Sequence, residues 1–182
     1  MTVVRANALL LLLSSVLLIS GNVRAQDAQP SEYQVKAAFI FNFIRFTEWP
    51  PDAFAESTSP LTIGVLGESP FGAELERAVQ TKTINNHAMV VTSCRTLAEA
   101  KRCQVLFISV SENHRLAEIF EGLGEAHVLT VGETENFIKS GGMINFYREG
   151  NKFRFEINDA ATKRVGLKID SKLLGLSKKP SG

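Results

Sequence analysis

EYQVKAAFIFNFIRFTEWP, residues 32–50, decides more about the fold than any other stretch, because it is the most apolar segment outside the N-terminus. Ser31 before it is a residue type that caps helix N-termini, and Pro50-Pro51 at its end cannot continue a helix. The stretch therefore predicts one helix that ends before the prolines. Its four phenylalanines exceed what a helix with a single apolar face requires.

A step of about 100° per residue resolves most of this crowding. One broad side collects the predicted core residues Val35, Phe39, Ile40, Phe43, Ile44 and Phe46, and the opposite side collects Gln34, Arg45 and Glu48. Lys36 projects into the apolar sector, and we expect its stem to pass the apolar edge with the ammonium group in water. A functional buried lysine is the alternative. Phe41 lies on the polar side. Either a neighbouring segment covers it, or it contacts another protein, a setting in which aromatic residues are enriched.

Short apolar runs alternate with helical patterns after residue 60. Strands are predicted at 61–67, 88–94, 104–110 and 127–132, and helices at 69–80, 96–102 and 112–123. Continuous apolar strands are buried on both faces, and their alternation with helices indicates parallel βαβ units. We therefore predict an α/β fold, with a single three-layer domain and a mostly parallel sheet flanked by helices.

An antiparallel β-hairpin is predicted at 141–158, where a turn separates two runs. Phe153, Phe155 and Ile157 alternate with polar residues, which is the period of a strand with one apolar face. Beyond the hairpin we predict a helix at 159–166, a short strand at 167–170 and a last helical segment at 171–177.

Residues 1–25 have the pattern of a cleaved export signal. Arg5 precedes an apolar run at 8–20, and Val23 and Ala25 occupy the minus-three and minus-one positions of a cleavage site. The alternative is a membrane anchor, but the run is shorter than the roughly 20 residues that a spanning helix needs. We expect a signal peptide at 1–25, a disordered lead-in at 26–31, the domain at 32–177 and a flexible tail at 178–182.

The exported chain is close to electrical neutrality. Without Arg5 and Arg24 it carries 18 basic and 19 acidic residues. This balance gives no general attraction to nucleic acid. We therefore expect no nucleic-acid partner.

Cys94 and Cys103 flank the helix predicted at 96–102. Because thiols persist as bridges outside the cytoplasm, we expect an intrachain disulfide between them. Closing a loop of about ten residues would add about 2–3 kcal/mol in the chain-entropy model. Two free buried thiols are the alternative.

No catalytic or metal-binding pattern stands out. The histidines at 87, 114 and 127 lie in separate predicted elements without metal-ligand spacing. Neither a nucleophile elbow nor a dinucleotide-binding fingerprint occurs. Gly64 and Gly67 are expected to form a tight turn, with an anion-binding turn as the alternative. The residues thus predict a binding or interaction module, with no enzyme activity, no cofactor and no metal.

Glu156 and Asn158 project from the polar side of the hairpin. They have three open roles: capping the helix that begins at Asp159, binding a ligand, or simply facing water. Capping is the preferred interpretation, because asparagine is a strong N-cap residue.

Six segments also resemble a known family: 33–50, 61–67, 103–109, 128–133, 141–158 and 160–177. Together they are similar to the YfiR/HmsC-like family of periplasmic proteins. By this resemblance Trp49 and Pro50 end the first helix. Phe155, Glu156 and Asn158 belong to a signature reading FEIN, and Leu167, Leu173 and Leu174 belong to the closing segment.

The resemblance implies a periplasmic regulator rather than an enzyme. The best-known members of the family inhibit an inner-membrane diguanylate cyclase by engaging its periplasmic sensor domain, which lowers cyclic di-GMP and restrains biofilm formation. The expected partner is the periplasmic domain of such a cyclase or a similar sensor, with a homodimer as a further option. The predicted partner surface consists of Phe41, Arg45, Glu48 and Trp49. The alternative is a small-molecule binding protein with its site at the strand carboxyl ends near Gly67 and Gly132.

Overall fold

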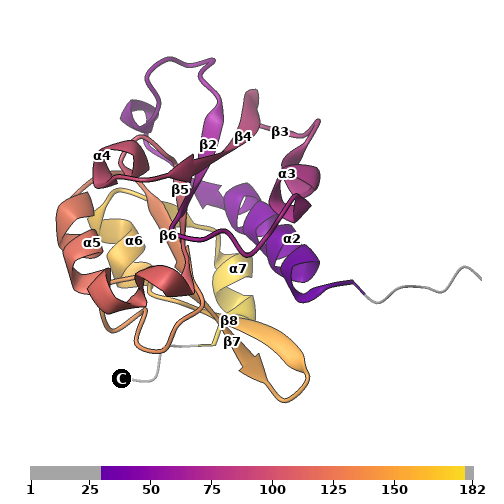
Figure 1. Ribbon diagram of the computed structural model, residues 1–182. Helices are drawn as coiled ribbons and strands as arrows, with labels where there is room; N and C mark the ends of the chain where they lie inside the picture. Colours follow the sequence, from indigo (N-terminus) through magenta and orange to yellow (C-terminus); the bar gives the residue numbers. More distant parts are fainter. Residues whose placement is uncertain (1–29, 179–182) are drawn as a thin grey trace, which may run out of the picture.

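The computed structural model describes residues 30–178. The predicted export signal, residues 26–29 of the lead-in and residues 179–182 of the tail lie outside the described range. The central sheet consists of seven strands, in the order β3 (Thr83–Ile84), β4 (His87–Cys94), β2 (Leu61–Leu66), β5 (Val105–Ile108), β6 (Leu129–Gly132), β7 (Ile144–Glu149) and β8 (Lys152–Ile157) (Figure 1).

The sheet is mixed but mostly parallel. Neighbouring strands pair in parallel from β4 through β2, β5 and β6 to β7, while β3 and β8 join the two edges antiparallel. The predicted α/β class and the predicted hairpin, now β7 and β8, are confirmed.

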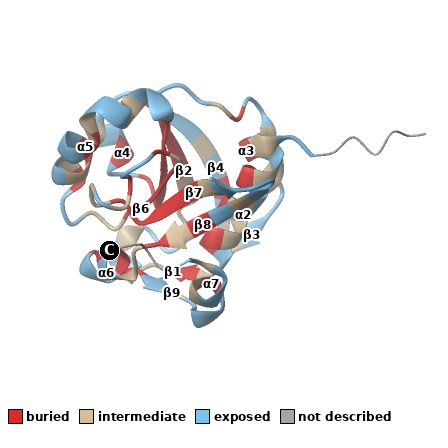
Figure 2. Ribbon diagram, turned by 90° about the horizontal axis from the view of Figure 1, so that it is seen from below, coloured by how far each residue is buried: buried red, intermediate tan, exposed pale blue. Residues whose placement is uncertain are grey.

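Helices cover both faces of the sheet. They are α2 (Glu32–Arg45), α3 (Glu74–Val79), α4 (Leu97–Ala100), α5 (Leu116–Leu123), α6 (Asp159–Arg164) and α7 (Ser171–Leu176), with 3-10 turns η1 (Pro51–Ala53) and η2 (Val110–Arg115). Val105 and Phe107 belong to the apolar cluster that α2 and α3 cover, whereas Leu106 and Ile108 belong to the cluster beneath α4 and α5. This alternation explains the continuous apolar run of β5, and Figure 2 shows buried residues along the central strands.

Helix α2 begins with a reciprocal cap. The Ser31 hydroxyl accepts from the Gln34 N–H at 3.2 Å, and the Gln34 side chain accepts from the Ser31 N–H at 2.9 Å. The helix ends at Arg45 rather than at Trp49 and Pro50. A short strand, β1 (Thr47–Glu48), replaces its expected last turn, because these residues pair antiparallel with β9 (Lys168–Ile169).

Burial along α2 follows the predicted face with one exception. Ile40, Phe43 and Ile44 are buried as expected, while Val35, Phe39 and Phe46 are half-buried and Gln34, Arg45 and Glu48 are exposed. The Phe43 ring centroid lies 5.0 Å from that of Phe155 and 5.4 Å from that of Phe146, so α2 packs directly on the hairpin. The prediction for Lys36 is wrong, because its side chain is buried and its ammonium group pairs with carboxylates instead of extending into water.

The remaining helices are shorter than predicted. The helix expected at 69–80 begins only at Glu74, and Gly72 before it has a positive φ of 54°, which interrupts a helix. The helix expected at 112–123 starts as the 3-10 turn η2 and becomes α-helical at Leu116. Gly64 was expected in a turn but lies inside β2, and Gly67, with φ 88°, makes the turn without it.

Candidate functional site

Phe41 and Arg45, two of the predicted partner residues, lie together on the outer side of α2. Lys82, which follows α3, joins them: its Nζ lies 4.0 Å from the centroid of the Phe41 ring, and the Arg45 guanidinium carbon lies 5.8 Å from it. Phe41 is half-buried, and neither cation pairs with a described carboxylate. We call Phe41, Arg45 and Lys82 the Phe41 patch. It is an aromatic ring flanked by two cations, and sequence reasoning missed Lys82 because it comes from another element.

Glu48 and Trp49, the other two predicted partner residues, lie on the segment after α2. Glu48 is exposed on β1. Trp49 is half-buried, and its indole N–H donates to the Gln104 carbonyl at 3.1 Å. Its ring lines a pocket of about 150 Å³ together with Phe54 and His87, whose own rings stack at 4.0 Å. Trp49 is therefore anchored to the domain by its polar atom, and only part of its ring is available to a partner.

Lys36 forms a buried ion cluster at the carboxyl end of β6. Its ammonium group pairs with Glu133, which directly follows Gly132, and with Glu32 at 2.5 Å. The side chains of Lys36 and Glu133 are only 6% and 7% exposed. The Tyr33 hydroxyl donates to the second Glu133 oxygen at 3.2 Å, so the carboxylate is bound on both sides. The sequence signal for this cluster was a lysine in an apolar sector, which requires a buried counter-charge.

The Lys36 cluster holds its lysine in the charged form. Burial lowers the pKa of Lys36, but the hydrogen bonds to Glu133 and Glu32 outweigh it and leave the pKa raised. Burial also raises the pKa of Tyr33, as does the Glu133 charge. Because the folded pKa of Lys36 is raised, its stabilising effect is complete at neutral pH and is lost only as the pH rises through that value. At neutral pH the lysine serves as a fixed charge rather than a nucleophile or base.

The three signature residues have three different roles. Phe155 is buried in the core against Phe43. Asn158 caps α6, accepting from the Ala161 N–H at 3.1 Å, as the capping interpretation predicts. Glu156 does not cap the helix. It accepts from the Asn145 amide at 3.3 Å and lines a separate pocket on the face of the hairpin away from α2.

The two glycines expected near a ligand crevice are closely packed instead. A Cβ at Gly132 would lie 2.3 Å from the Phe137 ring, and one at Gly67 would lie 2.4 Å from the Ser111 hydroxyl oxygen. These glycines therefore allow side chains to approach the backbone. A pocket of about 290 Å³ does open at this end of the sheet, lined by Lys36, Glu133 and several aromatic residues.

Cys94 and Cys103 meet over the backbone of β2. Their sulfur atoms lie 3.7 Å apart, and a Cβ at Gly64 would lie 2.7 Å from each of them, so the missing side chain makes room for both. Both are buried free cysteines here, and burial raises the pKa of both thiols, that of Cys103 to about 12. A disulfide requires about 2.05 Å between the sulfur atoms, and bridging remains a prediction.

We expect the exported protein to carry the Cys94–Cys103 bridge. Alkylation in denaturant without reductant, followed by peptide mapping, should find the two cysteines linked. Reduction should then lower the free energy of unfolding by about 2–3 kcal/mol without unfolding the domain. Gly64→Ala should hinder bridging, because the added methyl group occupies the space of both sulfur atoms. Recovery of both cysteines as alkylated thiols would contradict the bridge.

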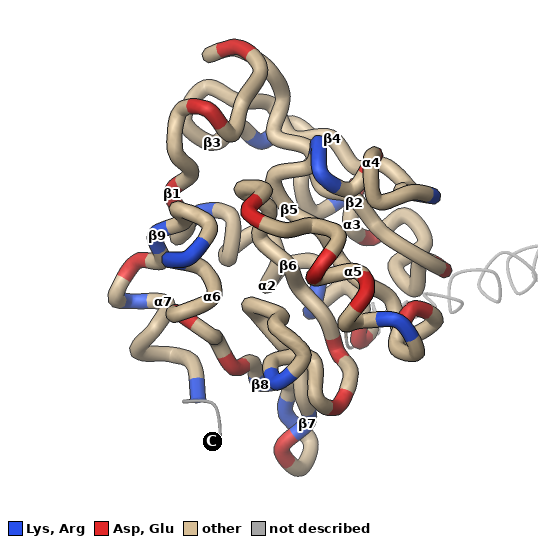
Figure 3. The backbone as a smooth tube through the Cα atoms, turned by 90° about the vertical axis from the view of Figure 1, so that its left-hand side faces the viewer, with Lys and Arg blue, Asp and Glu red and all other residues tan. Residues whose placement is uncertain are grey.

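Within residues 30–178 no group of three or more His, Cys, Asp or Glu side chains is placed to hold a metal ion. No helix in the same range is long and apolar enough to cross a bilayer. Basic and acidic residues are mixed over the side shown in Figure 3.

The fold and these sites define an α/β domain with a cation-flanked aromatic patch on α2 and a buried ion cluster around Lys36. The chain belongs to the YfiR/HmsC-like family, whose model matches residues 33–178. Membership supports a periplasmic and regulatory, rather than catalytic, role in general terms. No curated protein matches the sequence.

A solved structure has a similar fold. It is a conserved domain protein from Vibrio cholerae O1 biovar El Tor strain N16961, with a TM-score of 0.55 and 11% sequence identity. The match covers 83% of this chain but only 60% of that chain. At this identity the similarity concerns the fold alone.

Proposed function

We propose that the protein binds the periplasmic sensor domain of an inner-membrane diguanylate cyclase and lowers its output. The observation that carries this proposal is the family match over residues 33–178, which spans nearly the whole described domain. The partner is an expectation from the family resemblance. The structure contributes a candidate surface for it.

The Phe41 patch is the part of the predicted surface that suits a protein partner best. Its half-buried aromatic ring offers apolar area, and two cations that pair with no described carboxylate lie beside the ring. Aromatic and arginine side chains are enriched among residues that dominate binding energy. The matching surface of the partner would have an apolar depression for the Phe41 ring with carboxylate side chains around it. Binding at this patch should therefore weaken as salt concentration rises.

Cellular cyclic di-GMP tests the proposal directly. Deleting the gene should raise the cyclic di-GMP level. Expressing the exported protein in the deletion strain should lower that level again. No change on deletion would contradict the cyclase proposal. Loss of repression from a chain retained in the cytoplasm would support action from the periplasm.

Phe41→Ala should abolish most of the repression while the protein remains folded. Truncating a central interface aromatic costs about 2 kcal/mol or more, which is about a thirtyfold loss of affinity. The matched control is Leu176→Ala, because Leu176 is another large apolar residue and is 71% exposed on α7, outside the patch. Equal repression by the wild type and Phe41→Ala would remove the patch from the binding surface. Melting temperatures of both variants show whether a lost effect is a folding defect.

A further inference from the structure

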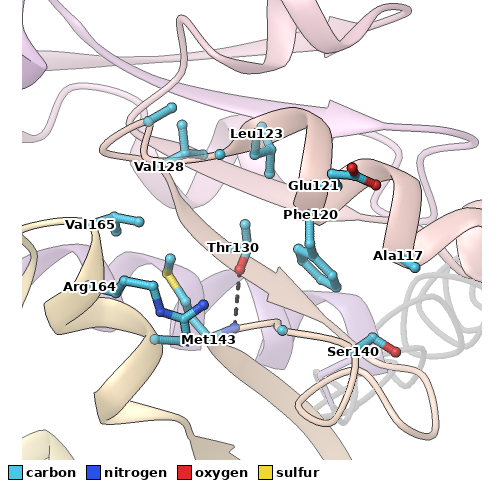
Figure 4. Close-up of a pocket in the computed structure, with 14 residues that line it drawn as sticks. Ala117, Phe120, Glu121, Leu123, Val128, Thr130, Ser140, Met143, Arg164 and Val165 are labelled. Atoms are coloured by element: carbon cyan, nitrogen blue, oxygen red, sulfur yellow. Dashed lines mark hydrogen bonds between the residues drawn. The ribbon is translucent and has the colours of Figure 1, made fainter.

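A pocket of about 300 Å³ lies between α5, β6 and α6. The pocket is a gap between α5 and α6 that is closed by β6 and by Ser140, Gly141 and Met143 before β7 (Figures 1 and 4). Thr130 of β6 lies in this gap, while its neighbours Leu129 and Val131 pack in the cluster beneath α2. The remaining wall is mainly apolar: Phe120, Leu123, Val128, Met143 and Val165.

Arg164 and Thr130 contribute polar groups to this pocket, which Glu121 and Ser140 also line. Arg164, at the end of α6, extends toward Met143 and Thr130 in Figure 4, and its guanidinium group pairs with no described carboxylate. Thr130 is 1% exposed; its hydroxyl accepts from the Met143 N–H at 3.1 Å and donates to no described acceptor. Arg164 and Thr130 thus line the same pocket, and within residues 30–178 the guanidinium group has no carboxylate partner and the hydroxyl hydrogen has no acceptor.

We propose that this pocket binds a small organic anion, a carboxylate with an apolar body, whose head group pairs with Arg164. Pockets that bind small molecules combine apolar walls with a few placed polar groups, and this volume is at the lower end of their range. The Arg164 guanidinium suits a carboxylate because it can donate two parallel hydrogen bonds. Glu121 lies across the pocket from Arg164 (Figure 4), so a second negative charge at that rim would be repelled and a monoanion is favoured.

The position of the pocket connects it to the signature strand. Helix α6 starts at its N-cap Asn158, directly after β8, and ends at Arg164. A ligand held by Arg164 therefore contacts the helix that the signature sets in place. This gives the protein a site for a small-molecule signal, in addition to its proposed protein partner. Ligand binding is measured on the purified exported protein without a partner, so its failure would leave the cyclase proposal unaffected.

Hexanoate is a suitable probe, with 1-hexanol and hexylamine as matched probes that carry the same apolar chain. For a ligand of about eight non-hydrogen atoms, affinity near the millimolar range is expected. Hexanoate should raise the melting temperature in a saturable manner and shift the backbone amide signals of Thr130, Met143 and Arg164. The alcohol and the amine should bind more weakly, since only the carboxylate pairs with the guanidinium group.

Three variants locate the binding to Arg164. Arg164→Gln should weaken hexanoate binding about tenfold to hundredfold, the loss expected for hydrogen bonds to a charged group. Lys163→Gln, which removes a neighbouring charge that does not line the pocket, should bind hexanoate as the wild type does. Arg164→Glu should reverse the preference, so that hexylamine binds better than hexanoate.

Three results would overturn the proposal. They are the absence of saturable hexanoate binding, equal binding of 1-hexanol and hexanoate, and equal losses in Arg164→Gln and Lys163→Gln. The Arg164 variants should fold as the wild type does, because Arg164 is exposed and does not belong to the apolar core.

Discussion

Phe43→Ala should lower the free energy of unfolding by about 3–5 kcal/mol, the range for truncating a buried phenylalanine. Phe43 is fully buried, and its ring contacts those of Phe146 and Phe155 on the hairpin. The loss combines the apolar area removed from the core with the cavity left between α2 and the hairpin. Urea denaturation measures the change, and a fall of about 10 °C in the melting temperature should accompany it.

Phe41→Ala is the matched control for Phe43→Ala, since both change the same residue type on the same helix. Because the Phe41 ring is half-buried, this variant should lose clearly less stability. If the two variants lose equal stability, Phe41 is a second core residue and the case for the Phe41 patch fails. A double variant with Phe155→Ala should show coupling of about 0.5–1.5 kcal/mol with Phe43→Ala, because the rings form an edge-to-face pair.

Lys36→Met should cost about 3–5 kcal/mol of stability, because it leaves the buried Glu133 carboxylate without its cation. The methionine replaces the length and apolar stem of lysine, so the loss reflects the missing charge more than a cavity. Lys163→Met is the matched control. Its ammonium group also pairs with a carboxylate, that of Asp159, but is 69% exposed, and such pairs contribute about 1 kcal/mol or less.

A second substitution separates the charge effect from other causes. Lys36→Met combined with Glu133→Gln should recover much of the lost stability, since no unpaired charge remains buried. The pH dependence gives a further check. Wild-type stability should decline in alkaline solution as Lys36 loses its proton, and the decline should be smaller in the double variant, where only groups such as Tyr33 still contribute to it. A loss in Lys36→Met no larger than in Lys163→Met would show that the cluster is not a desolvated ion pair.

Local patterns were sufficient for much of the architecture. The 3.6-residue period placed Ile40, Phe43 and Ile44 in the core, and the two-residue period placed the hairpin residue Phe155 against them. The preference of asparagine for helix N-caps correctly favoured the capping role of Asn158. These features are readable because each depends on residues close together in the chain.

Short strands left no comparable signal. β1 and β3 contain two residues each, which is too short to show a period. The early end of α2 depends on β1 pairing with β9, far along the chain. The proline pair therefore set the last position that a helix could reach. The pairing of β1 with β9 ends α2 earlier, at Arg45.

The sequence by itself determined the α/β class, the core face of α2, the hairpin and the family. Only the tertiary structure decided which distant groups meet: Glu133 with Lys36, Lys82 with Phe41, both cysteine sulfurs over Gly64, and Arg164 with Thr130. The physical reason is that periodicity and capping act within a few residues, whereas ion pairs and pockets depend on where the sheet brings separate segments together. Lys36 and Glu133 are 97 residues apart in the chain, and no local preference of either residue specifies the other.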